Sequence, residues 1–127
     1  MHENEIATII VDTVFHIHRD LGPGLFEIVY ERIMEAELSK RGLSVHRQKP
    51  IPIVYGGLHF GAGFRCDLLV GDKVIVEVKS IEAIHPVHKK QVLTYLKFAD
   101  KRLGLLINFN VALIKDGITR LVNRLNE

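Results

Sequence analysis

The sequence has little of what a disulfide-linked, zinc-binding or membrane-embedded protein needs. It contains a single cysteine, Cys66, so no disulfide can form within the chain and no paired-cysteine zinc motif is present. The apolar residues of the first segment are interrupted too often to span a membrane. Acids and histidines also stand where a secretory signal needs a basic start. We therefore expect a cytoplasmic protein without a membrane segment.

Internal repeats, low-complexity tracts and credible linkers are also missing. The chain has 127 residues, of which 47% are hydrophobic. That length is enough for one compact core and too short for two ordinary ones. We expect a single domain that spans residues 1–127.

Charge is nearly balanced overall but unevenly distributed. The net charge is +2, yet residues 1–43 hold 4 Lys/Arg against 8 Asp/Glu, whereas residues 44–127 hold 13 against 7. A clustered positive field attracts phosphate backbones, although a solvated lysine face produces the same bias and is the more common cause. Charge alone therefore favours a solvated lysine face over a nucleic-acid-binding surface.

The spacing of apolar residues predicts three helices, over residues 5–18, 25–41 and 86–100. Glycine and proline at positions 22–24 separate the first two. β-Branched and aromatic residues predict three antiparallel strands, over residues 45–55, 58–70 and 73–80. Pro50 and Pro52 place the first of these strands at a sheet edge or make it irregular.

The last part of the chain predicts further strands. Residues 103–109 form a continuous apolar run that fits a buried strand, and residues 111–114 are expected to pair with 118–122 in a final hairpin. The element order is helix, three strands, helix, strand. We therefore expect an α/β fold with a mixed β-sheet flanked by helices.

The residues with the most chemical potential lie on two neighbouring predicted strands. Glu77 and Lys79 are two residues apart, so their side chains share a strand face, and a hairpin can bring Asp67 against them. Two adjacent carboxylates repel unless a cation lies between them, and oxygen ligands favour Mg²⁺ or Mn²⁺ over Zn²⁺. The alternative is an ordinary exposed pair on an amphipathic strand. Because Asp67 lies in a largely apolar run, where an unpaired acid is costly, the two interpretations are balanced.

This arrangement resembles a known family. Asp67 followed by Glu77-Val78-Lys79, in this element order, is similar to the core of the PD-(D/E)XK nuclease superfamily. The resemblance implies a restriction-endonuclease-like core in α-β-β-β-α-β order. It also implies that Asp67 and Glu77 bind a metal ion and that Lys79 takes part in catalysis.

A second motif narrows the resemblance. Gly24, Glu27 and Tyr30 have the spacing that names the GxxExxY proteins, and residues 91–96 and 104–109 are also similar to blocks of that family. The resemblance implies that Glu27 completes the acidic cluster as a third metal ligand. The alternative for Glu27 is a first-turn acid that favours the helix dipole.

The third predicted helix carries a polar stripe. Gln91 and Tyr95 are four residues apart, and His88 is three residues before Gln91, so all three share one helix face. Gln91 and Tyr95 resemble a Gln-x-x-x-Tyr element that lies close to metal and substrate in some nucleases of this superfamily. The alternative is a stripe that hydrogen-bonds over the sheet, which is the better interpretation for His88.

We therefore expect an Mg²⁺-dependent or Mn²⁺-dependent nuclease that hydrolyses phosphodiester bonds in DNA or RNA. One alternative is a nucleic-acid-binding or protein-interaction module that keeps the nuclease fold but has little catalysis. Another is a metal-dependent hydrolase of a different phosphate-containing substrate. Because a small domain has little surface for reading a duplex, weak specificity, a homodimer or a partner subunit is expected.

Overall fold

The computed structural model describes residues 1–126 of the chain. Its elements, in chain order, are α1 (Glu3–Leu21), α2 (Glu27–Lys40), β1 (Val45–Tyr55), β2 (Leu58–Val70), β3 (Val74–Lys79), α3 (Pro86–Ala99), β4 (Leu103–Asn108), the 3₁₀ helix η1 (Ile114–Gly117) and β5 (Ile118–Val122). Among these residues no helix combines the length and the apolar character that a membrane crossing requires.

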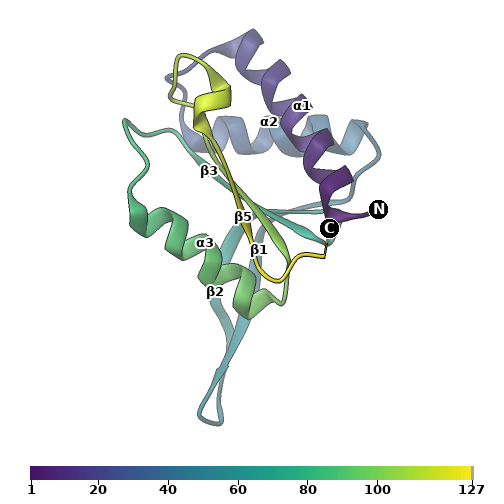
Figure 1. Cartoon of the computed structure of the whole chain (residues 1–127), viewed down its shortest axis with the longest axis vertical. Coiled ribbons are helices and arrows are strands. Elements are labelled where there is room, and N and C mark those ends of the chain that lie inside the picture. The colour runs from purple at the N-terminus through teal and green to yellow at the C-terminus, as the bar shows by residue number, and fades with distance from the viewer. Residues whose placement is uncertain (127) are drawn as a thin grey trace.

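The five strands of the described residues form one mixed sheet in the order β1-β2-β3-β4-β5 (Figure 1). β1, β2 and β3 are antiparallel neighbours, as predicted. β3 and β4 are parallel and are connected through α3, and β5 pairs antiparallel with β4. β1 is an edge strand and its register shifts between Ile51 and Ile53, which confirms the expectation from the two prolines.

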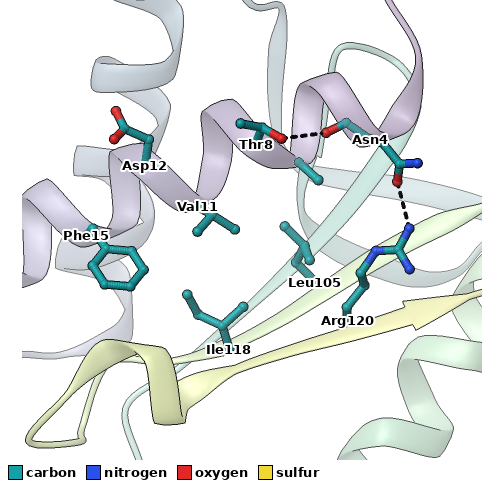
Figure 2. Close-up of a pocket in the computed structure, with 9 residues that line it drawn as sticks. Asn4, Thr8, Val11, Asp12, Phe15, Leu105, Ile118 and Arg120 are labelled. Atoms are coloured by element: carbon teal, nitrogen blue, oxygen red, sulfur yellow. Dashed lines mark hydrogen bonds between the residues drawn. The ribbon is translucent and has the colours of Figure 1, made fainter.

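Helices cover both faces of this sheet. Figure 1 shows α1 and α2 on one side and α3 on the other. A hollow of about 770 Å³ opens between α1 and the β4–β5 edge. Val11 and Phe15 of α1 face Ile118 of β5 across it, and Arg120 donates a hydrogen bond to Asn4 at one end (Figure 2).

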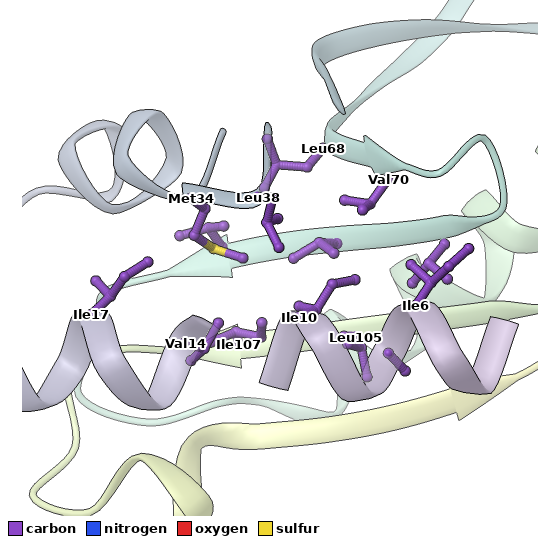
Figure 3. Packing of buried hydrophobic residues seen from close by; sticks show 14 of the residues in the cluster. Ile6, Ile10, Val14, Ile17, Met34, Leu38, Leu68, Val70, Leu105 and Ile107 are labelled. Atoms are coloured by element: carbon purple, nitrogen blue, oxygen red, sulfur yellow. The ribbon is translucent and has the colours of Figure 1, made fainter. Parts of the chain in front are cut away.

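The larger core lies under α1 and α2. Figure 3 shows Ile6, Ile10 and Val14 of α1 with Met34 and Leu38 of α2, all buried and packed against the sheet. A smaller cluster under α3 contains Val92 and Leu96. The strand residues divide between the two layers, because successive side chains on a strand point to opposite faces.

β3 shows this division most clearly. Val74, Val76 and Val78 belong to the α1/α2 core, whereas Ile75 belongs to the α3 cluster. By the same alternation, Glu77 and Lys79 fall on the side of β3 that α3 covers.

Two expectations about element boundaries were wrong. The predicted final hairpin does not form: η1 occupies residues 114–117, and β5 pairs with β4 from Leu103↔Val122 to Ile107↔Ile118. The α2 helix begins at Glu27 rather than Leu25, because Phe26 has an extended backbone, with φ of −67° and ψ of 149°, and serves as the N-cap. Both corrections arise from tertiary pairing and backbone geometry that apolar spacing does not encode.

Candidate active site

Asp67 and Glu77 meet where β2 and β3 separate. The paired register of these strands ends at Leu68↔Val76. Beyond it, the carboxylates accept hydrogen bonds from the main chain of the opposite strand: Asp67 N–H donates to Glu77 Oε2 at 2.7 Å, and Val78 N–H donates to Asp67 Oδ2 at 2.8 Å. Each carboxylate is therefore held in place by the backbone of its neighbour.

A residue of β1 connects this pair to α2. The side-chain amide of Gln48 donates to Asp67 Oδ1 at 3.2 Å and to Glu31 Oε1 at 2.9 Å. Gln48 has a φ of 50°, which is uncommon for a residue other than glycine. Gln48 thus links a third acid, Glu31, to the Asp67 carboxylate.

Sequence reasoning missed both Gln48 and Glu31. Glu31 is four residues after Glu27 and so shares its helix face, a signal that could have identified it. It is buried, and it also accepts a hydrogen bond from Arg47 Nε at 3.0 Å. No pattern in the sequence marks Gln48, because its placement depends on an irregular backbone within a strand.

The electrostatics of the acids reflect their crowding. Glu77 is only 6% exposed. Burial, followed by the nearby charge of Asp67, raises its pKa to about 8. The pKa of Asp67 is also raised, mainly by burial and then by the charge of Glu31, against the hydrogen bond from Val78 N–H. Concentrated negative charge of this kind is relieved by a bound cation.

Lys79 supplies positive charge to the same cluster. It ends β3, where it pairs with Asn108 of β4 and is half-buried. Its charge lowers the pKa of both Asp67 and Glu77, opposing the effect of burial. The three residues expected from the sequence therefore form one electrostatic unit.

Glu27 lies beside the end of β3. As the first residue of α2 it occupies the first turn, as the helix-dipole interpretation requires. Its Oε2 also accepts a hydrogen bond from Ser80 N–H at 3.2 Å. Both residues line an open hollow of about 420 Å³ with Phe26 and Asn110. Glu27 therefore borders a cavity at the strand end, and its role as a ligand stays a prediction.

Tyr30 fixes the loop that precedes Glu27. Its hydroxyl donates to Gly22 O at 2.6 Å and accepts from Leu25 N–H at 3.2 Å. Its buried ring stacks on Phe109, with the ring centroids 4.2 Å apart. The tyrosine of the motif thus holds the loop against the core, which sets where α2 begins.

The polar residues of α3 differ in position. Tyr95 is half-buried and stacks on Phe64 of β2, with the centroids 4.0 Å apart. The pKa of Tyr95 is raised by burial and then by the charges of Glu77 and Asp67, which places it near the acids. Gln91 is exposed, so its role stays a prediction. His88 Nδ1 accepts from His85 N–H and caps the helix.

The donor set can be compared with what Mg²⁺ needs. Within residues 1–126, no group of three or more His, Cys, Asp or Glu side chains is assembled to hold a metal ion. Mg²⁺ commonly keeps several waters and takes only one or two protein carboxylates. Asp67 and Glu77 fit that requirement because they are two adjacent carboxylates, which supply oxygen donors. The Cys66 thiol is buried, and burial raises its pKa to about 12.

Comparison with known proteins identifies the family. A family model described as the PD-(D/E)XK nuclease superfamily matches residues 4–121. The chain belongs to this superfamily. No curated protein and no solved structure gives a significant match. Superfamily membership accords with the mixed sheet flanked by helices, and it indicates nuclease activity in general, with a divalent metal ion and a nucleic-acid substrate.

Proposed function

We propose that this PD-(D/E)XK protein is a nuclease that hydrolyses DNA or RNA with Mg²⁺ or Mn²⁺ bound by Asp67 and Glu77. One observation carries the proposal: main-chain N–H groups fix the carboxylates of Asp67 on β2 and Glu77 on β3 where these strands separate, and β3 ends at Lys79. Crowded, partly buried acids are costly without a compensating cation. Metal binding offsets that cost.

The chain's residues would divide the work as follows. A bound divalent ion supplies a Lewis acid that polarises the phosphate and lowers the pKa of water. Asp67 and Glu77 bind it, and Glu27 completes the acidic cluster from α2. Lys79 stabilises the negative charge that develops on the phosphate oxygens in the transition state.

Residues of α3 are proposed to meet the substrate. Tyr95 borders the acids, and Gln91 lies one turn earlier with an exposed side chain. An exposed amide can hydrogen-bond to a sugar or phosphate without first losing a protein partner. We propose that Gln91 and Tyr95 orient the substrate beside the acids.

We further assign the chain to the GxxExxY proteins within the superfamily. The support is the coupling of the motif residues: Tyr30 holds the loop that contains Gly24, and Glu27 follows that loop at the start of α2. We propose a cytoplasmic protein of one domain, residues 1–127, that acts as a homodimer or with a partner subunit.

One observation favours a binding module without catalysis. In the described part of the chain, residues 1–126, three metal ligands are not preassembled. A protein of this kind would bind nucleic acid through its basic surface and leave it intact.

A cleavage assay separates the two functions. Single-stranded, duplex and branched DNA and RNA are incubated with the protein and Mg²⁺, Mn²⁺ or EDTA. The nuclease proposal expects cleavage of at least one substrate, loss of cleavage in EDTA, and recovery when metal is restored. Asp67→Asn keeps the side-chain shape but removes the charge, so it should abolish cleavage. Intact substrates with both metals would support the binding module.

A further inference from the structure

The β1–β2 hairpin extends well beyond the helices. Figure 1 shows it as a long two-stranded projection from the sheet. We call residues 52–63 the hairpin arm. Its turn, Gly56-Gly57, has φ values of 56° and 82°, the positive pair required by a type I′ turn. The flanking pairs Tyr55↔Leu58 and Ile53↔Phe60 continue the ladder, so the arm is an ordered ribbon.

One face of the arm exposes large apolar side chains. Tyr55, Leu58 and Phe60 are 78%, 62% and 51% exposed. Directly paired and alternate residues share a ribbon face, so these three lie together with Ile53. Val54 is 56% exposed and lies on the opposite face. Aromatic side chains left in water at the end of a projection are characteristic of a contact surface.

The charge around the arm indicates that its binding partner is a polyanion. No Asp or Glu occurs from residue 38 to residue 66. Lys49 and Arg65, at the base of the arm, are both exposed. The nearby Arg47 is already engaged in its ion pair with Glu31. Basic side chains at the base of an acid-free arm that carries solvent-facing rings match nucleic acid, which has phosphates and flat bases.

The arm also connects with the candidate active site. Ile51 and Phe64, a cross-strand pair at its base, both belong to the cluster under α3. Phe64 stacks on Tyr95, which borders Asp67 and Glu77. The register of the two strands shifts between Ile51 and Ile53, so the exposed side chains begin just beyond this irregularity. The arm therefore extends from the part of the sheet that packs beside the candidate active site.

We propose that the hairpin arm binds single-stranded nucleic acid by stacking unpaired bases on Tyr55 and Phe60, with Lys49 and Arg65 contacting the phosphates. That the bound strand leads to Asp67 and Glu77 for cleavage rests on the proposed function, whereas binding by the arm does not. Substrates with an unpaired segment are preferred, because the rings need accessible base faces.

Reading of duplex grooves fits the arm less well. A two-stranded ribbon can enter the major groove, but base edges are read there by side chains such as Arg, Lys, Asn and Gln. Residues 52–63 contain none of these, and His59 is the only strongly polar side chain among them apart from the Tyr55 hydroxyl. The arm has the chemistry for stacking rather than for sequence reading.

The test measures binding without cleavage. Fluorescence anisotropy in EDTA follows labelled oligothymidine, oligouridine and a duplex of the same length. The double variant Tyr55→Ala/Phe60→Ala should weaken single-strand binding by about tenfold or more, because each stacked base contributes substantially. Val54→Ala is the matched control, since it truncates an equally exposed side chain on the other face. Tyr55→Phe with Phe60 intact should bind as wild type.

Salt dependence separates stacking from charge. The double ring variant should keep the wild-type slope of log affinity against log salt. Lys49→Ala/Arg65→Ala should make that slope shallower by about 0.7 for each phosphate that the variant no longer neutralises. Circular dichroism should show that all variants fold as wild type, because the altered side chains are exposed.

Several results would overturn the proposal. They are a wild-type protein that binds no single strand, a ring variant that binds as tightly as Val54→Ala, or a preference for duplex that the rings do not affect. Light scattering that shows loss of a dimer in the ring variant, with binding per chain unchanged, would assign the arm to self-association. If binding behaves as expected but Mg²⁺ and Mn²⁺ produce no cleavage, the proposed nuclease function fails and the arm proposal stands.

Discussion

The main-chain N–H of Asp67 donates a 2.7 Å hydrogen bond to the carboxylate of Glu77. The two acids belong to antiparallel strands, and the Asp67 carboxylate in turn accepts from Val78 beside Glu77. This exchange replaces ladder hydrogen bonds where the strands part. It holds the two carboxyl groups close together, so ionising both of them in the metal-free protein carries an electrostatic cost.

That cost predicts how stability depends on pH. Burial and the charge of Asp67 raise the pKa of Glu77 from an ordinary 4.5 to about 8, with Glu31 adding to the shift and Lys79 opposing it. Between these values the folded protein binds a proton that the unfolded chain releases. The free energy of unfolding should therefore fall as pH rises from about 4.5 to 8 in EDTA.

Glu77→Gln is the matched variant for this prediction. The amide oxygen can still accept the Asp67 N–H but cannot ionise, so denaturant unfolding in EDTA should show a higher stability at pH 7 and a flatter pH profile. Adding Mg²⁺ should raise the thermal midpoint of the wild type and leave that of Glu77→Gln almost unchanged. Parallel pH profiles for the two proteins would contradict the prediction.

Lys79 should affect rate rather than metal affinity. A lysine amine is not expected to ligate the cation, so Lys79→Ala should keep metal binding while the cleavage rate falls by a factor on the order of 100 to 1,000. Lys97→Ala, which removes an exposed lysine of α3, is the control for a reduced positive charge. Equal losses of rate in both variants would assign Lys79 to the general basic surface.

Substitutions of Gln48 and Gln91 should have different effects, the first on stability and metal binding and the second on KM. Gln48→Ala leaves the Asp67 and Glu31 carboxylates without their shared donor, which should destabilise the fold by about 1–3 kcal/mol and weaken metal binding. Gln91→Ala removes an exposed side chain, so it should raise KM and leave stability unchanged. A metal titration and steady-state kinetics distinguish the roles. Unchanged metal affinity in Gln48→Ala would show that Gln48 does not contribute to the metal site.

The sequence predicted the centre of this site better than its surroundings. The two-residue spacing of Glu77 and Lys79 and a short hairpin to Asp67 are local features, so alternation and turn chemistry were enough to bring them together. Gln48 reaches Asp67 through a positive φ in β1. Such a conformation depends on the whole sheet and α2, which no local pattern records.

For the fold, as for the site, the sequence predicted the local elements but not all of their pairing. The apolar periods identified α1, α2 and α3, β-branched and aromatic runs identified β1 to β3, and a continuous apolar run identified β4. The final pairing was wrong because residues 111–114 and 118–122 are close in sequence, which favours a hairpin. In the structure the unpaired edge of β4 takes residues 118–122 as β5, and Ile114 is buried in the α1/α2 core. Competition of this kind between local and distant partners is settled by tertiary packing.

The Tyr30 hydroxyl should contribute to stability through the motif loop. Tyr30→Phe keeps the stacked ring but leaves Gly22 O and Leu25 N–H without their partner, which should cost about 1 kcal/mol or more. Tyr55→Phe is the control, because its 78% exposed side chain lies at the tip of the hairpin arm. Denaturant midpoints measure both. Equal midpoints for the two variants would show that the hydroxyl does not hold the loop.

The most direct test of the central claim is a Mn²⁺ titration followed by electron paramagnetic resonance, which counts bound and free ion without requiring turnover. Wild type should bind the ion, Asp67→Asn should lose most of that binding, and Asp72→Asn should bind as wild type. Asp72 is the control because it is an exposed acid in the turn between β2 and β3, close in sequence to both proposed ligands. Wild-type affinity in Asp67→Asn, or no binding by the wild type, would contradict a metal site formed by Asp67 and Glu77.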